Sequence, residues 1–239
     1  MKTLGVIGGL GPMATAYFME LVTTMTDAAR DQDHIDMLIF SRPRTPDRTG
    51  FILGSSSENP LPVMADSAVR LAAEGAQVLA IPCNTAHYFH AQVQEAVSVP
   101  VLHMIRETAQ YLKSHGITQA GIMATDGTIR TGLYQNALAE QGIAAVIPSA
   151  DAQKKVMHLI YENVKAGKPP EMELFHAVNK ELKQQGAQAV LMACTELSVI
   201  KKSNDLGGGI LDTMEVLAKT AVERCEAPLR EDFRELITG

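Results

Sequence analysis

The sequence lacks several features that would assign it to a class at once. No apolar run approaches the ~20 residues that a helix needs to cross a bilayer. The chain also enters a short apolar segment at residues 3–8 without the basic region of a secretory signal. We therefore expect a cytoplasmic protein with no membrane partner. Tryptophan is absent too, but its absence excludes no fold and no function.

Cysteine and basic residues are also scarce. Three cysteines, an odd number spread far apart, do not form a disulfide framework, so we expect free thiols in a reducing compartment. The net charge is −6 and no basic run occurs, which argues against a nucleic-acid partner. Hydrophobic residues make up 46% of the 239 residues, which is ordinary for a globular protein. This length accommodates two domains of about 100–120 residues.

What the chain does contain is a repeated segment that ends in a cysteine. Residues 75–85 are GAQVLAIPCNT, and residues 186–196 are GAQAVLMACTE. The two align without a gap at an offset of 111 residues (186 − 75, and 194 − 83). An apolar run between a glycine and polar residues is typical of a buried parallel strand that leads into a helix. Cys83 and Cys194 therefore lie where a strand ends, which is where open α/β sheets bind their ligands.

A second repeat relates the starts of the two halves. Residues 4–11, LGVIGGLG, correspond to residues 120–127, AGIMATDG, at an offset of 116 (121 − 5). We predict an α/β protein with two pseudo-symmetric domains, each a mostly parallel sheet flanked by helices, and an active site in the interdomain cleft. The first domain is expected at residues 1–102 plus 212–239, and the second at 103–211.

The periodicity of the remaining segments gives the individual elements. It predicts strands at 3–8, 35–40, 76–82, 99–102, near 120, and at 143–147, 187–193 and 210–211. It predicts helices at about 13–30, 58–74, 84–96, 104–115, 130–141, 151–166 and 171–185, and others from 195 onward and from 212 to about 226. Residues 41–57 have weak periodicity and are expected to form a long loop, of the kind that often serves as a lid.

Two cysteines at equivalent strand ends suit one reaction well. The partial positive charge at a helix N-terminus lowers the pKa of a thiol from about 8.5, so that a thiolate forms near neutral pH. One thiolate can then remove a proton from a carbon while the other thiol protonates the opposite face. A buried cysteine is also a common core residue, and we interpret Cys225 in this way. For Cys83 and Cys194, the gap-free repeat favours a catalytic pair.

Polar residues beside the two thiols suit the binding of a carboxylate. Asn84, Thr85 and Thr195 stand at the predicted starts of helices, where unpaired N–H groups bind anions. Helix capping alone would also account for these residue types. The two explanations are compatible.

The glycine-rich turn after the first strand permits a different interpretation. Residues 9–14, GLGPMA, match the G-x-G-x-x-A pattern of dinucleotide-binding proteins. The second strand ends in Arg42 rather than in the acidic residue that holds a ribose, although an arginine would suit a 2′-phosphate. An NADP-dependent oxidoreductase is therefore an alternative, and a tight turn that approaches the substrate is the preferred interpretation.

The histidines do not indicate a metal site. His87 and His90 lie three residues apart near Cys83, but a zinc site needs three or four converging ligands. We expect no metal, and we consider that His87 helps to orient the first thiol.

Taken together, these motifs resemble the aspartate/glutamate racemase superfamily. The resemblance is carried by residues 8–15 (GGLGPMAT), 82–87 (PCNTAH) and 194–197 (CTEL), while residues 46–49 (PDRT) are similar to the aspartate racemase branch. It covers nearly the whole chain, with the motifs in the expected order. It implies two pseudo-symmetric α/β domains and the racemisation of amino acids without pyridoxal phosphate, metal or other cofactor.

The resemblance also implies roles for individual residues. Cys83 and Cys194 would be the two acid/bases. Substrate-binding roles are implied for Met13, Arg48, Asn84, Thr85, Thr125, Lys165 and Thr195. The Arg48 guanidinium would pair with the side-chain carboxylate, for which its planar shape is suited, and Lys165 would lie near the substrate. Without the resemblance, Arg48 would be a surface residue of a polar loop, and Lys165 would compensate a helix dipole.

Two residues depart from the family pattern. Ala193 stands where glycine is usual before the second cysteine, and Ser198 stands where proline is common. Both changes alter the turn around Cys194, so they bear on rate and substrate choice more than on the mechanism.

The sequence thus predicts a cofactor-independent amino-acid racemase with aspartate as the first candidate substrate and glutamate as the second. Cys83 and Cys194 are expected on opposite faces of the substrate α-carbon, and the enzyme is expected to be a homodimer. The alternatives are a related isomerase, hydantoin racemase or decarboxylase, and a non-catalytic binder of acidic amino acids.

Overall fold

The computed structural model describes residues 1–239, and its chain divides into two compact units. Unit 1 comprises Met1–Met104 and Met214–Leu236, and unit 2 comprises Ile105–Thr213 and Ile237–Gly239. The expected domains have similar bounds, and the division of the chain into two domains stays a prediction. No helix combines the length and the apolar character that crossing a membrane requires.

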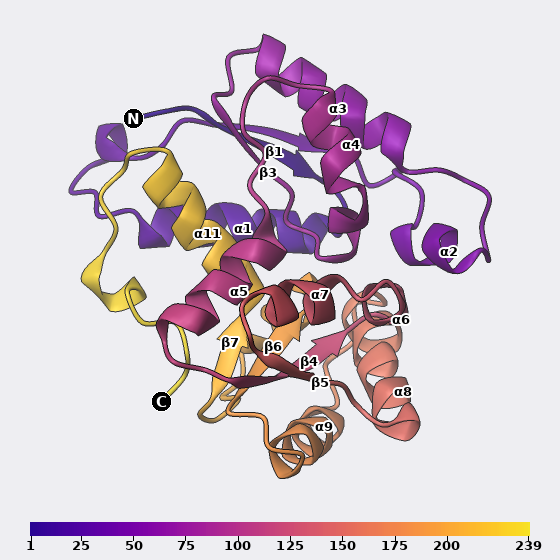
Figure 1. Ribbon diagram of the computed structural model, residues 1–239. Helices are drawn as coiled ribbons and strands as arrows, with labels where there is room; N and C mark the ends of the chain where they lie inside the picture. Colours follow the sequence, from indigo (N-terminus) through magenta and orange to yellow (C-terminus); the bar gives the residue numbers. More distant parts are fainter. The chain divides into compact units, whose positions relative to one another are not determined.

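Unit 1 contains three strands and most of the helices that precede residue 104 (Figure 1). Its elements are β1 (Leu4–Gly8), α1 (Pro12–Met25), β2 (Met37–Ser41), α2 (Arg48–Leu53), α3 (Leu61–Ala73), β3 (Val78–Ala80), α4 (His90–Glu95) and α11 (Thr213–Arg224, from Met214 on). Three 3₁₀ turns accompany them, at Asp31–Asp33, Thr85–Phe89 and Glu231–Phe233.

Unit 2 contains four strands. Its elements are α5 (Met104–Ser114, from Ile105 on), β4 (Gln119–Ala124), α6 (Asp126–Arg130), α7 (Leu133–Glu140), β5 (Ala144–Val146), α8 (Ala150–His158), a π-helical segment (Leu159–Val164), α9 (Met172–Gln184), β6 (Ala189–Ala193), α10 (Thr195–Lys201) and β7 (Ile210–Asp212).

The two sheets have the same strand order. The sheet of unit 1 has the order β2-β1-β3, and an isolated parallel bridge from Leu79 to Val101 follows β3. The sheet of unit 2 has the order β5-β4-β6-β7. All of these pairings are parallel. The predicted α/β fold class with two parallel sheets is therefore confirmed. In each sheet the strand order reverses beside the first strand, which creates the position where open α/β sheets bind ligands.

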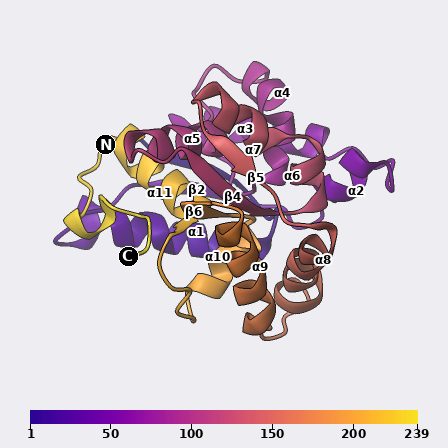
Figure 2. The same ribbon diagram turned by 60° about the horizontal axis from the view of Figure 1, so that its bottom comes forward.

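Helices cover both faces of each sheet. In unit 1, α3 and α4 lie on one side of the sheet and α1 and α11 on the other (Figures 1 and 2). In unit 2, α8 and α9 lie on one side, and α5 and α7 on the other. A buried apolar cluster fills the layer beneath the first pair of helices in each unit. Burial on both faces explains why the strands are continuous apolar runs.

Several predicted helices are shorter than expected or are divided. Helix α1 ends at Met25 rather than near Arg30, because Thr26 is extended and forms an antiparallel bridge with Leu229. The predicted helix at 84–96 is a 3₁₀ turn followed by α4. The predicted helix at 130–141 is divided by Gly132, which has φ of 67° and separates α6 from α7.

Residues 41–57 are not the long loop that their weak periodicity predicts. They contain the short helix α2, whose N-cap Asp47 accepts a hydrogen bond from the Gly50 N–H at 2.6 Å. The helix ends at Gly54, which is left-handed with φ of 78°. Its two ends are thus fixed by a capping side chain and by a glycine, although a helix of 6 residues is too short to show a helical period in the sequence.

Matched glycines let a helix approach the central strand of each sheet. A Cβ at Gly5 in β1 would lie 3.3 Å from the Cβ of Leu71 in α3 and 2.8 Å from that of Ala76, which follows α3. A Cβ at Gly121 in β4 would lie 3.1 Å from the Cβ of Leu182 in α9 and 3.2 Å from that of Ala187, which follows α9. Ala76 and Ala187 are themselves equivalent in the sequence repeat (187 − 76 = 111). The repeat therefore preserves the close approach as well as the strand order.

Gly5→Ala should destabilise the protein more than Gly121→Ala. At Gly5 the nearest atom would be the Leu79 Cδ2 at 2.4 Å, whereas at Gly121 it would be the Leu182 Cβ at 3.1 Å. We expect a loss in the free energy of unfolding of about 1–3 kcal/mol for Gly5→Ala and of less than about 1 kcal/mol for Gly121→Ala. Urea unfolding of the two variants measures both losses, and an equal or reversed order would contradict the packing argument.

Candidate functional site

Both repeated cysteines lie just beyond the carboxyl end of a strand next to the central strand. Cys83 follows β3 by three residues, and Cys194 directly follows β6. Both are free and buried, with 7% and 5% of their surfaces exposed. In each unit the cysteine is therefore at the position where the strand order reverses.

A neutral histidine fixes the backbone at Cys83. The Nδ1 of His87 lies 2.9 Å from the Cys83 carbonyl oxygen, and its Nε2 accepts a hydrogen bond from the Met104 N–H at 3.1 Å. The carbonyl accepts and the N–H donates, so Nδ1 carries the proton and the ring is neutral. Burial lowers the pKa of His87 from 6.5 to about 4. The His87 ring thus fixes the backbone turn by its hydrogen bond to the Cys83 carbonyl group.

The glycine turn after β1 is closely packed. The Thr15 hydroxyl accepts a hydrogen bond from the Gly9 N–H at 2.9 Å and donates one to the Gly11 carbonyl at 3.0 Å. A Cβ at Gly9 would lie 2.2 Å from the Arg42 backbone nitrogen. The glycine therefore makes room for the chain that leaves β2. This close packing explains the G-x-G-x-x-A pattern without a dinucleotide.

Arg48 is buried, whereas without the family resemblance it would be expected on the surface of a polar loop. It is the first residue of α2 and is 9% exposed, and its Nη1 donates a hydrogen bond to the Pro46 carbonyl at 3.0 Å. Helix α2 packs near the 3₁₀ turn after Cys83, where the rings of Phe51 and Phe89 are 5.8 Å apart. Arg48 and Cys83 are thus carried by neighbouring elements. Met13, in the first turn of α1, is 68% exposed.

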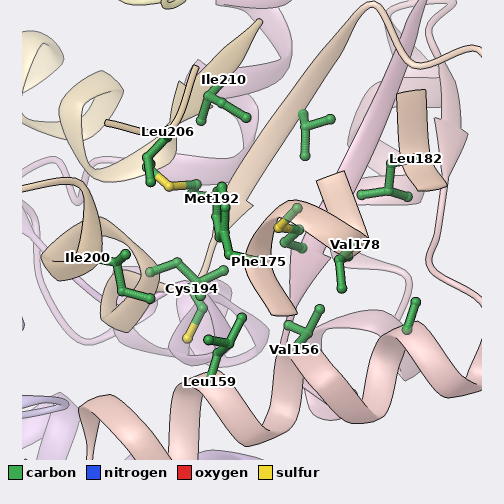
Figure 3. Close-up of a cluster of buried hydrophobic side chains, with 14 of the residues drawn as sticks. Val156, Leu159, Phe175, Val178, Leu182, Met192, Cys194, Ile200, Leu206 and Ile210 are labelled. Carbon is green, nitrogen blue, oxygen red and sulfur yellow. The ribbon is translucent and has the colours of Figure 1, made fainter. Parts of the chain in front are cut away.

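The environment of Cys194 contains a carboxylate and a cation. The Cys194 thiol donates a hydrogen bond to the Glu196 Oε2 at 2.9 Å, and the Lys165 ammonium is 3.9 Å from the Glu196 Oε1. Figure 3 shows Cys194 among the apolar side chains of the unit 2 core, near Leu159. Burial and the Glu196 carboxylate raise the pKa of the Cys194 thiol well above its usual value. The expectation that a helix N-terminus lowers this pKa is therefore wrong.

An irregular helix sets the direction of the Lys165 side chain. Helix α8 continues into the π-helical segment Leu159–Val164, and the Lys165 N–H bonds to the Ile160 carbonyl, five residues earlier. The Lys165 ammonium lies 4.0 Å from the centre of the Tyr161 ring. Such π-turns are rare and occur frequently at functional sites. The lysine therefore contacts the Glu196 carboxylate and the Tyr161 ring in addition to standing near a helix end.

The polar residues expected at helix starts have different local roles. Thr125 caps α6, because its hydroxyl accepts a hydrogen bond from the Thr128 N–H at 3.3 Å. Asn84 precedes the 3₁₀ turn and makes no capping hydrogen bond through its side chain. Cys194 itself occupies the N-cap of α10, which makes Thr195 the first helical residue. The expectation of capping is therefore wrong for Asn84 and Thr195. Thr85 begins the 3₁₀ turn and is buried.

Ser198 has a structural use that proline could not supply. Its hydroxyl donates a hydrogen bond to the buried Asp212 carboxylate at 2.6 Å and so joins α10 to the end of β7. The departure at Ser198 thus supports the helix that carries Cys194.

Tyr134 in α7 interacts electrostatically with Asp212 and Cys194, and burial raises the pKa of the Tyr134 hydroxyl above its ordinary value.

Glu196 is the main site residue that sequence reasoning missed. An acidic residue in the first turn of a helix ordinarily complements the helix dipole, and this hides any other role. Its place two residues after the repeated Cys194, where Thr85 follows Cys83, is the signal that could have marked it. No group of three or more His, Cys, Asp or Glu side chains is arranged to hold a metal ion.

Comparison with known proteins is consistent with this arrangement. The family model described as Asp/Glu/Hydantoin racemase matches residues 7–221. The broad specificity amino-acid racemase RacX of Bacillus subtilis is 30% identical over 230 residues, which cover 92% of this chain and 96% of RacX. These matches confirm the resemblance that the motifs indicated.

Solved structures extend the similarity to the fold. The aspartate racemase of Picrophilus torridus is 31% identical with a TM-score of 0.83, and the match covers 98% of both chains. The glutamate racemase of Francisella tularensis in complex with D-glutamate is 18% identical with a TM-score of 0.67, over 93% of this chain and 80% of that one. At this identity the second match shows the fold alone.

Acid should destabilise the native protein through His87. An unfolded histidine binds a proton near pH 6.5, whereas folded His87 does so only near pH 4. The stability from the neutral ring is therefore complete above pH 6.5 and is lost as the pH falls toward 4, by about 3 kcal/mol in total. Urea unfolding across this range should show a larger loss for the native chain than for His87→Gln, and equal losses would contradict the assignment.

Proposed function

Because the chain belongs to the Asp/Glu/hydantoin racemase family, we propose that it racemises an amino acid by a two-base mechanism with Cys83 and Cys194. The observation that carries this proposal is the equivalence of the two thiols. Each follows the corresponding strand of a sheet with the same order, β3 in one unit and β6 in the other. A two-base racemase uses such a pair, with one acid/base on each face of the α-carbon.

The mechanism moves two protons at one carbon. The thiolate of one cysteine removes the α-proton from one face of the substrate, and the thiol of the other protonates the opposite face of the planar carbanion. The reverse reaction exchanges these roles. The family enzymes are racemases, and the expected enzyme class, which needs no cofactor, is confirmed at that level.

We propose an acidic amino acid as the substrate, with aspartate first and glutamate second. Arg48 would bind the side-chain carboxylate, and its support is a buried guanidinium on an element that packs next to the turn of Cys83. Asn84, Thr85, Thr125 and Thr195 would hold the α-carboxylate and amino group, with Met13 and Lys165 near the substrate. The similarity to an aspartate racemase supports this choice, and the similarity to RacX supports testing a broad panel of amino acids.

The proposal includes a homodimer that acts in the cytoplasm. Sedimentation velocity distinguishes a monomer from a dimer, and a monomer at assay concentration would remove that part of the proposal.

Incubation in D₂O tests the reaction directly. With L-aspartate, the native enzyme should replace the α-proton with deuterium and form D-aspartate, followed by NMR and chiral chromatography. Cys83→Ser and Cys194→Ser should each slow racemisation by about 10²–10⁴-fold, because each removes one acid/base. We expect each single variant to exchange the α-proton of one enantiomer with solvent deuterium without inverting it.

Cys225→Ser is the matched control, since Cys225 lies at the end of α11 and has no role in the proposal. Native racemisation by Cys83→Ser or Cys194→Ser would overturn the two-base scheme. The absence of exchange with every amino acid in the panel would favour another reaction of the family or a binding role.

Arg48→Met should weaken selection for acidic substrates. Loss of the guanidinium removes a bidentate partner of the side-chain carboxylate, so kcat/KM for aspartate should fall by about 10–100-fold. The activity toward alanine, if present, should change much less. Arg44→Met is the control because Arg44 is an exposed residue just before α2. An equal loss for aspartate and alanine would assign Arg48 a structural role.

A further inference from the structure

The two-base scheme leaves one buried carboxylate beside Cys194 without a task. We propose that Glu196 is a positioning residue that keeps Cys194 as a protonated thiol in the resting enzyme, and that Lys165 moderates this effect. The inference rests on the proposed function, because it assigns Cys194 the role of proton donor at rest. It concerns a residue that lies within the motif at 194–197 but to which the sequence analysis assigned no role.

The geometry gives the two Glu196 oxygens different partners. Oε2 accepts the thiol hydrogen bond at 2.9 Å, and Oε1 faces the Lys165 ammonium at 3.9 Å. Loss of the thiol proton would therefore place a negative sulfur at hydrogen-bond distance from a carboxylate oxygen. Two like charges this close in a buried site repel strongly. The arrangement thus favours the thiol over the thiolate.

Burial strengthens this preference and explains the need for Lys165. Glu196 is 6% exposed and Cys194 is 5% exposed, so little water screens their interaction. A buried carboxylate requires a partner, and the ammonium of Lys165 supplies one from the end of the π-helical segment. The same ammonium also makes a cation–π contact with the Tyr161 ring, whose centre is 4.0 Å away.

Among the other titratable groups on the elements around Cys194 are Asp212, Tyr134 and Lys165, and of these Lys165 opposes Glu196. Asp212, at the end of β7, has a carboxylate that accepts the Ser198 hydroxyl. Tyr134, on α7, is neutral because burial raises its pKa. Lys165 is the cation that lowers the pKa of Cys194, while burial and Glu196 raise it. Removal of Glu196 and removal of Lys165 should therefore have opposite effects.

The proton balance of the reaction follows from this resting state. The α-proton passes to the thiolate of Cys83, and the thiol proton of Cys194 passes to the opposite face of the same carbon. The products are the inverted amino acid, a Cys83 thiol and a Cys194 thiolate. Repulsion by Glu196 then drives the Cys194 thiolate to regain a proton, and the Cys83 thiol releases one.

Alkylation of Cys194 tests the inference without any need for catalysis. Iodoacetamide reacts with the thiolate, so its rate at a fixed pH follows the thiolate fraction. At pH 8, Glu196→Gln should alkylate Cys194 about tenfold faster than the native chain, and Lys165→Met should alkylate it about threefold to tenfold more slowly. Mass spectrometry of the digest measures the labelling of each cysteine peptide separately.

Two internal controls separate this effect from loss of structure. The Cys225 peptide in the same digest should label at one rate in every variant, because Cys225 is buried in unit 1, whereas the substituted residues belong to unit 2. Glu196→Asp retains the charge and should remain close to the native rate. If Glu196→Gln unfolds, Cys225 labels faster as well, and Lys165→Met then decides: an unchanged or faster Cys194 rate overturns the proposal.

The pH profile of kcat/KM supplies the second readout. Its upper limb reports loss of the proton from the acid of the pair, so it should move to lower pH in Glu196→Gln. A purely structural role would reduce activity at every pH and leave the limb in place. A native Cys194 alkylation rate in folded Glu196→Gln overturns the proposal, whether or not the enzyme racemises. If Cys194 is alkylated faster in Glu196→Gln but the native chain exchanges no α-proton, the interaction between Glu196 and Cys194 is retained and the racemase mechanism is rejected.

Discussion

The structure depends on the close approach of a helix to the central strand in each sheet. Gly5 and Gly121 have no Cβ, and α3 and α9 pack against the strands at these points. The helix then turns into the next strand, so the distance between helix and sheet determines where β3 and β6 begin. Because each of these strands leads to a cysteine, a packing constraint within the core also sets the position of the chemistry.

The two cysteine environments are built differently within this common frame. Cys83 precedes a 3₁₀ turn, and its backbone carbonyl is bound by the neutral His87 of that turn. Cys194 caps an α-helix, and its thiol contacts a carboxylate that faces an ammonium. The repeat thus preserves the backbone positions of the thiols while the surrounding polar groups have diverged. A symmetric reaction does not require symmetric surroundings, since each thiol needs only the correct proton at the correct stage.

The sequence revealed the fold because the fold is repeated in it. The matching segments at 75–85 and 186–196 locate two strand ends independently of any single helix or strand prediction. Local details were harder, because they depend on contacts between distant residues. Thr26 ends α1 by pairing with Leu229, and Asp47 begins α2 with a single capping bond. Neither produces a hydrophobic period that a sequence window can detect.

In the site, as in the fold, the features that depend on sequence neighbours can be predicted, whereas those that depend on contacts formed by folding cannot. The positions of Cys83 and Cys194 follow from strand ends, and the sequence predicts them. The sign of the pKa shift at Cys194 depends on burial and on Glu196, whose carboxylate turns back toward the thiol. A helix N-terminus alone suggests the opposite sign. The local dipole is therefore outweighed by desolvation and by one nearby charge, which only the folded chain reveals.

The π-helical segment before Lys165 also affects how this region can be aligned with other chains. An α-helix advances about 100° per residue, so a helical wheel drawn through α8 and continued past Val164 assigns the lysine to the wrong direction. The wider turn at Leu159–Val164 shifts the phase of everything that follows it. A relative with an uninterrupted helix would therefore need a one-residue gap here. Without that gap, its counterpart of Lys165 would be sought one position away from where it lies.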